Sequence, residues 1–276
     1  MASELTLHHE LVSAPDSAPD QWLLVLHGIF GSGVNWRTFA KRLVGRRPAW
    51  GAVLVDLRMH GQSQGAPPPH TVAAAAADVA ALAAALEADG RVVGGVCGHS
   101  FGGKVGLQLA ADAAGAVPRV WVLDSDPAAD TDAMASKRST ASVLRMLEQL
   151  PREYPTRAAF VSRVVETGVD RGLAQWLAMN VVPDGDEFRL RLDMAAMRSL
   201  LASYYATDLW PAADAVAGQS ELHFVLGADS TAVSEASKVR MRTLRATVDE
   251  IAAAGHWLHV DAPDALLDII ATGLTT

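Results

Sequence analysis

Residues Val92-Val93-Gly94-Gly95-Val96-Cys97-Gly98-His99-Ser100-Phe101-Gly102-Gly103 decide the fold. The stretch opens as an apolar run, passes through a G-x-S-x-G pattern at 98–102, and continues into a helix-like segment at 104–114. A sharp turn from strand to helix holds such a serine in strained backbone geometry, and the glycines let neighbouring backbone pass without Cβ clashes. The helix N-terminus beneath the serine favours developing negative charge. The pattern therefore predicts a nucleophilic serine at Ser100.

Short apolar runs recur along the chain, with helix-like segments between them. In 71–88 the larger apolar residues lie on one helical face, with alanines of high helix propensity between them. Runs of four or five residues that do not alternate with polar ones suit strands buried on both faces, as in a parallel sheet. Strand alternating with helix predicts an α/β fold with a mostly parallel sheet flanked by helices. The runs are Trp22–Leu26, Ala52–Val55, Val92–Val96, Val120–Leu123, Leu222–Leu226 and Val248–Ile251.

The alternation stops between residues 127 and 214. Segments such as ASVLRMLEQL and MAAMRSLLASYY are helical in pattern, prolines punctuate them, and no strand-like run is evident. We therefore expect a core domain formed by residues 1–126 and 215–276, with 127–214 inserted between two strands as a helical cap over the sheet edge.

A serine hydroxyl needs a base to remove its proton. The candidate is His256, which follows Gly255 directly after the last strand-like run. His259 lies three residues further on and is the fallback, but we expect it to pack or to face solvent.

The acid that orients the base has two main candidates. Asp124 and Asp229 each follow a strand-like run, so both are expected at the carboxyl edge of the sheet, beside Ser100 and His256. Asp126 is a third choice, and capping of the following helix is its simpler role. The residues themselves do not decide between Asp124 and Asp229 as the acid.

The first strand-like run ends in Leu26-His27-Gly28-Ile29-Phe30-Gly31. At this position the backbone N–H of Ile29 is expected to join that of Phe101 in an oxyanion hole, with Phe30 as the neighbouring alternative. His27 resembles a base, but we expect it to hydrogen-bond loops together.

Other chemistry-bearing residues have structural interpretations. Asp56 and Arg58 are expected to fix a loop after their strand, and Cys97 is expected to be a small core residue. One cysteine permits neither an intramolecular disulfide nor a cysteine-based zinc site, and no metal site is predicted.

Composition narrows the class of protein. The 276 residues carry 31 acidic against 23 basic side chains, a net charge of −8 that argues against a nucleic-acid partner. No segment reaches the ~18 consecutive apolar residues of a membrane span. The first twenty residues contain neither an apolar stretch nor Lys or Arg, so we expect no signal peptide and a cytoplasmic location. The oligomeric state is left open.

The segments HGIFGS, DLRMHGQS, GHSFGGK and GHWLHVDAPD resemble the α/β-hydrolase superfamily over essentially the whole chain. Within it they resemble the small esterase group typified by bacterial YbfF and the animal α/β-hydrolase domain 11 proteins. The resemblance implies Asp124 as the acid. That group reads GGNS where this chain has Gly227-Ala228-Asp229-Ser230, so Asp229 stays a competitor. The resemblance also implies a supporting hydrogen bond from Ser230 near His256.

The resemblance further implies a serine hydrolase that needs no cofactor. Ser100 would attack, His256 would shuttle the proton, and the acid would stabilise the imidazolium. We expect small-molecule esters or thioesters with small to medium apolar acyl groups as substrates. Two alternatives remain: a carbon–carbon bond hydrolase or perhydrolase with the same triad, and a ligand-sensing protein that keeps the fold and signals through its cap.

Overall fold

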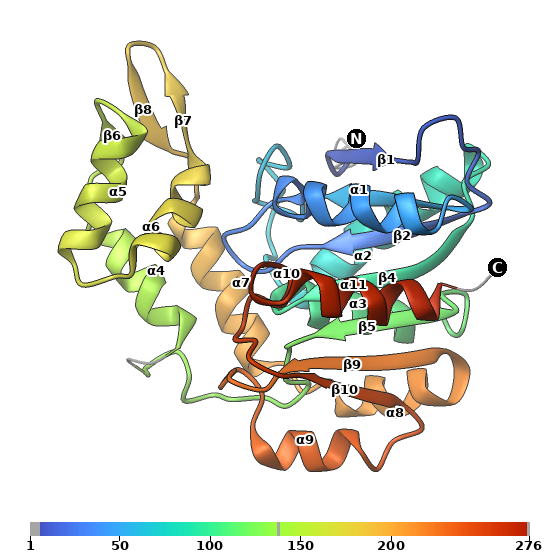
Figure 1. The fold of residues 1–276 in the computed structure, drawn as a ribbon. Helices are drawn as coiled ribbons and strands as arrows, with labels where there is room; N and C mark the ends of the chain where they lie inside the picture. Colours follow the sequence, from blue (N-terminus) through green and yellow to red (C-terminus); the bar gives the residue numbers. More distant parts are fainter. Residues whose placement is uncertain (1–5, 137–138, 275–276) are drawn as a thin grey trace.

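The computed structural model describes residues 6–136 and 139–274, and its core is a seven-stranded sheet of order β1-β3-β2-β4-β5-β9-β10 (Figure 1). Every neighbouring pair is parallel except β1 and β3. Five of the six predicted runs lie within the parallel strands and the sixth, Val92–Val96, begins one residue before β4, which confirms the mostly parallel α/β sheet. The strands are β1 (His9–Val12), β2 (Gln21–Leu26), β3 (Trp50–Val55), β4 (Val93–His99), β5 (Arg119–Leu123), β9 (Glu221–Gly227) and β10 (Thr247–Ile251).

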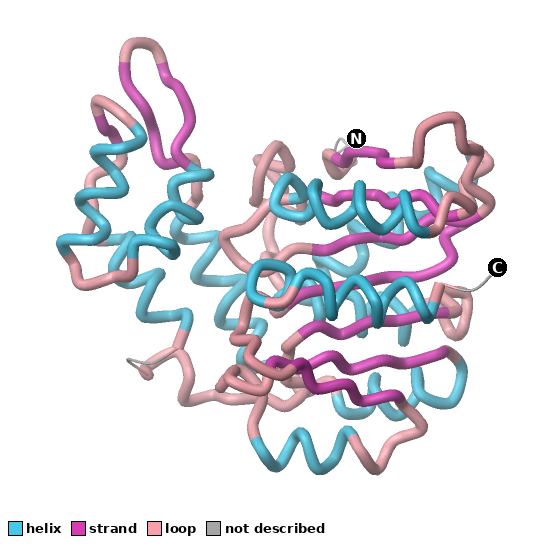
Figure 2. The backbone as a smooth tube through the Cα atoms, in the orientation of Figure 1, coloured by secondary structure: helices cyan, strands magenta, loops and turns pink. Residues whose placement is uncertain are grey.

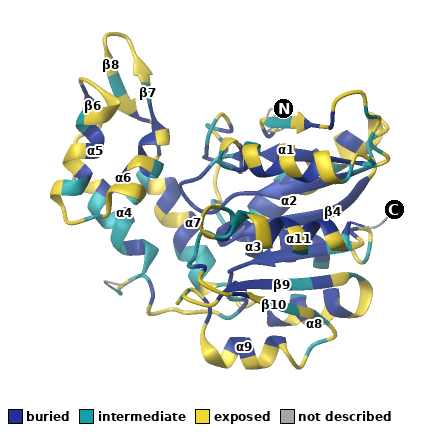
Figure 3. Ribbon diagram, in the orientation of Figure 1, coloured by how far each residue is buried: buried dark blue, intermediate teal, exposed yellow. Residues whose placement is uncertain are grey.

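Helices cover both faces of this sheet, which is why its strands read as unbroken apolar runs. Leu24 and Leu26 of β2 belong to one hydrophobic cluster, whereas Leu23 and Val25 belong to the other. Figure 3 shows the central strands buried along most of their length. Among the helices of the described residues, none is long and apolar enough to cross a membrane. The first face carries α2 (Val72–Ala88), α3 (Phe101–Asp112) and α8 (Trp210–Gln219), and the second carries α1 (Arg37–Arg46) and α11 (Pro263–Gly273).

Strand β1 was not expected from the sequence. It pairs antiparallel with β3 at the sheet edge, with His9 opposite Val55. Only its last residue is buried, because an edge strand with one covered face does not need a continuous apolar run. Four residues that include His9 and Glu10 carry no recognisable strand pattern.

The segment between β5 and α8 holds most of the remaining elements, and its helices and short strands stand beyond one end of the sheet (Figure 1). The predicted helices are present, but the expectation that this segment contains no strand is wrong. Three short strands form a separate antiparallel sheet of order β6-β8-β7, visible in Figure 2. The elements are α4 (Thr140–Glu148), β6 (Glu153–Tyr154), α5 (Arg157–Glu166), α6 (Arg171–Leu177), η2 (Ala178–Asn180), β7 (Val181–Asp184), β8 (Glu187–Leu190) and α7 (Met194–Ala206).

The predicted division at residues 126/127 and 214/215 stays a prediction. Helix α8 runs across residue 214 and packs on α3 and β9, with Ala213 and Val216 buried. We refer below to residues 127–207, which precede α8, as the insertion.

Candidate active site

Ser100 lies in the tight turn between β4 and α3. Its backbone has φ 53° and ψ −115°, a region that non-glycine residues rarely adopt. A Cβ on Gly98 would lie 2.0 Å from the carbonyl oxygen of Gly102. A Cβ on Gly102 would lie 2.6 Å from the carbonyl oxygens of Leu26 and His27. Gly98 is therefore required for the turn to close on itself, and Gly102 for the turn to pack against the end of β2.

Asp124 and His256 are joined at the carboxyl edge of the sheet. The Nδ1–H of His256 donates to Oδ2 of Asp124 at 2.7 Å. The Asp124 side chain is buried, and it also accepts the Gly227 N–H on Oδ1 at 3.2 Å and the Ser230 hydroxyl on Oδ2 at 2.5 Å. Three donors thus hold this carboxylate, two from the end of β9 and the loop that follows it and one from the loop of His256.

Asp229, the competing acid, lies apart from this bond. Its side chain is exposed, and its backbone N–H donates to the carbonyl of Ala254 at 2.9 Å. Within residues 6–136 and 139–274, no hydrogen bond links the Asp229 carboxylate to His256. Ser100 and His256 line the same cavities, but no hydrogen bond between the Ser100 hydroxyl and the imidazole is formed in this part of the chain.

Two further histidines surround His256. The Nε2–H of His99 donates to the His256 carbonyl oxygen at 2.7 Å, and burial holds the pKa of His99 well below its usual range. His259 stacks on Trp36 with ring centroids 4.2 Å apart, and burial lowers its pKa to about 4. Both rings are therefore neutral near neutral pH, His99 as a hydrogen-bond donor and His259 as a packing group.

His27 ties loops together, as its sequence position predicts. Its Nδ1–H donates to the Gly28 carbonyl at 2.8 Å, and its Nε2 accepts the Leu57 N–H at 3.0 Å. Burial lowers the pKa of His27, so the ring stays neutral and keeps one donor and one acceptor.

Two backbone amides beside Ser100 are unengaged. Neither the Ile29 N–H nor the Phe101 N–H donates to any described residue. The Phe30 N–H, the neighbouring candidate, already donates to Nε2 of His60 at 3.2 Å. Of the two amides in the first loop, the Ile29 amide is thus the one left for an incoming group.

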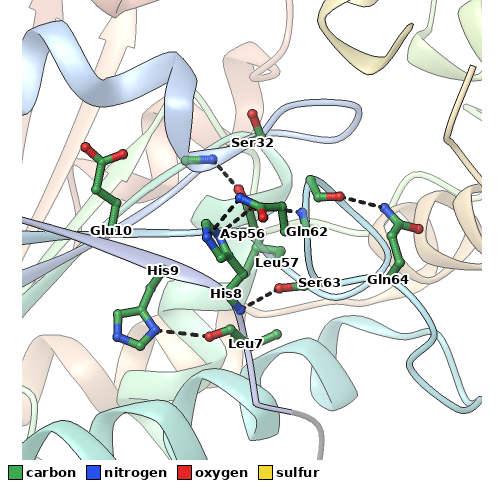
Figure 4. Close-up of polar contacts among 12 residues, drawn as sticks. Leu7, His8, His9, Glu10, Ser32, Asp56, Leu57, Gln62, Ser63 and Gln64 are labelled. Atoms are coloured by element: carbon green, nitrogen blue, oxygen red, sulfur yellow. Dashed lines mark hydrogen bonds and ion pairs between the residues drawn. The ribbon is translucent and has the colours of Figure 1, made fainter. Parts of the chain in front are cut away.

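Asp56 fixes the loop after β3, as Figure 4 shows. Its buried carboxylate accepts the Gly33 N–H at 2.8 Å, the Gln62 N–H at 2.9 Å and the His8 Nδ1–H at 3.1 Å. The buried Arg58 forms an ion pair with the partly buried Asp78 at 2.7 Å. Both residues thus have the expected loop-fixing contacts.

Lys104, one turn after Ser100, makes contacts that the sequence did not indicate. Its side chain is 2% exposed, and its ammonium donates to the carbonyls of Ala128 at 2.8 Å, Tyr204 at 2.8 Å and Thr207 at 2.6 Å. Ala128 is near the start of the insertion, and the other two are near its end. One side chain of α3 therefore holds both connections of the insertion.

Two cavities meet at Ser100 and His256. The first has a volume of about 260 Å³ and apolar walls, and the second has about 590 Å³ and more polar walls that include Tyr204 and Asp229. No cluster of His, Cys, Asp or Glu that could hold a metal ion is found among the described residues. Apolar walls of the first cavity come from Ile29, Phe30, Val143, Leu173, Trp176 and Trp257.

Comparison with known proteins gives consistent matches over most of the chain. The profile of the alpha/beta hydrolase family matches residues 23–269. The mouse sn-1-specific diacylglycerol lipase ABHD11 is 29% identical over 98% of this chain and 85% of its own length. Esterase YbfF of Escherichia coli is 27% identical over 90% of this chain and 91% of its own length. Among solved structures, a marine microorganism esterase superposes with a TM-score of 0.81 at 21% identity, covering 98% of this chain and all of that one.

Proposed function

The chain belongs to the α/β-hydrolase family, and from that premise we propose that it is a serine esterase acting on carboxylic esters or thioesters with small to medium apolar acyl groups. The observation that carries the proposal is the His256–Asp124 hydrogen bond of 2.7 Å beside a serine in strained turn geometry. The mouse lipase and the E. coli esterase, similar over most of the chain, support ester hydrolysis as the reaction.

In this proposal Ser100 is the nucleophile and His256 the base. The hydroxyl oxygen attacks the acyl carbon while its proton passes to Nε2 of His256, the ring nitrogen that Asp124 does not engage. Asp124 holds the tautomer and stabilises the imidazolium. The imidazolium then returns the proton to the departing alcohol or thiol, which leaves an acyl-enzyme. A water molecule, deprotonated by the same imidazole, releases the acid and restores Ser100.

The negative charge of each tetrahedral intermediate needs donors that are already in position. The unengaged N–H groups of Ile29 and Phe101 suit this role, because they need not break a bond to accept the oxyanion. The apolar cavity of about 260 Å³ beside Ser100 suits the acyl group. The wider cavity, with Tyr204 and Asp229 in its wall, is then left for the leaving group.

The proposal is tested with a series of p-nitrophenyl esters and acyl thioesters of increasing chain length, together with labelling by a fluorophosphonate. The wild-type protein should turn over repeatedly and be labelled, whereas Ser100→Ala should do neither and should keep the wild-type melting temperature. Ser220→Ala is the matched control, because its hydroxyl bonds to the Val117 carbonyl at the far end of β9. Labelling that survives in Ser100→Ala contradicts the nucleophile. A single slow turnover of every substrate favours the ligand-sensing alternative.

A further inference from the structure

A buried asparagine connects the insertion to the loop that follows β2. Asn180 ends η2, and its Nδ2 group donates to the Phe30 carbonyl at 2.8 Å and to the Leu177 carbonyl at 3.3 Å. Its side chain is buried, with 8% exposure, so the amide is shielded from competing water. The bond joins residues 150 positions apart in the chain.

Phe30 is held on both sides of its backbone. It has φ +63°, a left-handed conformation unfavourable for an aromatic residue, so surrounding contacts must maintain it. Its N–H donates to Nε2 of His60, and its carbonyl accepts from Asn180. The His60 ring is fixed in turn by its Nδ1–H, which donates to the Arg58 carbonyl at 2.9 Å.

The preceding peptide is held as well. The Gly28 carbonyl accepts the His27 Nδ1–H at 2.8 Å and the Gly31 N–H at 3.0 Å. In a trans peptide the N–H points opposite the carbonyl, so these two bonds direct the Ile29 N–H away from His27. The Ile29 N–H belongs to the same peptide as the Gly28 carbonyl, and the Gly31 N–H belongs to the same peptide as the Phe30 carbonyl that Asn180 holds. The Asn180 bond therefore acts on the direction of the Ile29 amide through the Gly31 N–H.

We propose that Asn180 is a positioning residue for the oxyanion hole: by holding the Phe30 carbonyl, it keeps the Ile29 N–H aimed at the site above Ser100. This inference rests on the proposed function for the role of that amide. The insertion is then more than a cavity wall, because η2 sets the direction of a donor in the core domain. Loss of the Asn180 bond allows Phe30 to relax from its left-handed conformation, and the Ile29 amide turns with it.

The first test examines the amide itself and needs no activity. The chain contains four isoleucines, so selective ¹⁵N-isoleucine labelling gives a spectrum in which the Ile29 signal can be assigned by comparison with an Ile29→Val variant. Asn180→Ala and the isosteric Asn180→Asp, which replaces the donor with an acceptor, should shift or broaden the Ile29 amide signal. Asn35→Asp is the matched control: it removes the Asn35 Nδ2 contact with Met179 Sδ at 3.1 Å but keeps the Oδ1 that accepts the Ser32 N–H, and Asn35 makes no hydrogen bond to Phe30 among the described residues. An Ile29 signal unchanged in both Asn180 variants overturns the inference.

The second test separates positioning from folding. Loss of one oxyanion donor typically costs about 10²–10³ in kcat, so misdirecting it should lower kcat about 10- to 100-fold. KM should stay within about threefold, because donors aimed at the oxyanion act mainly in the transition state. Affinity for an alkyl boronic acid, which places a tetrahedral oxygen in the oxyanion hole, should fall with kcat. A rise in KM at unchanged kcat overturns the inference and assigns Asn180 to wall packing alone.

Failure of the two proposals can be distinguished. If the wild-type protein neither hydrolyses the ester series nor reacts with the fluorophosphonate, the proposed function fails. The Ile29 amide signal still decides whether Asn180 controls this loop. If the wild-type protein is active and the Asn180 variants keep full kcat, only the inference on Asn180 fails.

Discussion

The Ser230 hydroxyl donates to Oδ2 of Asp124, the same carboxylate oxygen that accepts the Nδ1–H of His256. Both donors therefore bind and orient the same carboxylate oxygen, while the Gly227 N–H binds the other carboxylate oxygen. A carboxylate held in this way cannot rotate to follow a moving imidazole. We expect the position of the His256 ring to be dictated by Asp124 and not the reverse.

Ser230→Ala should lower kcat modestly. The variant removes one hydrogen bond to a carboxylate, of a kind worth about 1.5–3 kcal/mol, which corresponds to at most about 10- to 150-fold in rate. The Gly227 amide and the His256 ring still hold the carboxylate. Steady-state kinetics on one p-nitrophenyl ester measures the effect. A loss of about 10³ or more would give Ser230 a direct part in the reaction and contradict its supporting role.

Asp124→Asn should be far more severe. An amide at this position favours the wrong imidazole tautomer, and such a change lowers kcat by roughly 10⁴ where a carboxylate orients the base. Asp229→Asn is the matched control at the competing position, and its exposed side chain should change kcat little. If Asp229→Asn proved the more damaging of the two, Asp124 would not be the acid.

Trp176→Ala should change the preferred acyl length. The Trp176 ring lies 5.9 Å from that of Trp257 at the apolar cavity of about 260 Å³, so its removal lengthens that space. The optimum in kcat/KM across the ester series should move toward longer chains. Met179→Ala, which removes an exposed side chain of the same insertion, should leave the optimum in place. An unchanged optimum in Trp176→Ala would mean that the acyl group lies elsewhere.

Lys104 should make folding stability depend on alkaline pH. Burial lowers its pKa to about 8, against the opposing effect of Asp126, Asp208 and Asp130, whereas the unfolded chain has the ordinary lysine value of 10.5. Between these values the unfolded state binds the extra proton, so stability rises with pH, by up to about 1.4 kcal/mol per pH unit. The comparison is urea unfolding of the wild type and Lys104→Met from pH 7.5 to 10.5. The wild type should gain stability relative to the variant, and parallel curves would contradict the burial of a charged Lys104.

The central sheet could be predicted because the burial of each strand is visible in its own short stretch of sequence. Residues such as Leu23 and Leu24 face opposite helix layers, so an unbroken apolar run is the only sequence that satisfies both faces. The turn at Ser100 could also be predicted, because the backbone contacts at Gly98 and Gly102 are too close for any residue with a Cβ. Strand β1 and the small sheet β6-β8-β7 could not, because their strands are short and only partly buried, and β7 contains Pro183.

In the candidate site, too, some residues could be predicted from the sequence and others could not. Ser100 and His256 have neighbours in sequence that mark them, whereas the relation of Asp124 to Asp229 depends on how two loops fold around His256. Asn180 carries no local pattern, and its partner Phe30 is 150 residues away. Its role arises only when η2 is packed on the loop after β2. Long-range hydrogen bonds of this kind leave no trace in periodicity or spacing.

The three carbonyls bound by Lys104 attach both ends of the insertion to the core at one point. Ala128 and Thr207 both reach one ammonium group, so the chain leaves and re-enters the core within a few ångströms of one point. The entropy lost on closing a loop grows only slowly with its length once the ends are fixed together. Segments of quite different size can therefore be exchanged at this point with little effect on the rest of the fold, apart from the loop after β2 that Asn180 holds. A chimaera in which the residues between Ala128 and Tyr204 are replaced keeps all three carbonyls, and therefore keeps the contacts with Lys104 that join the insertion to the core.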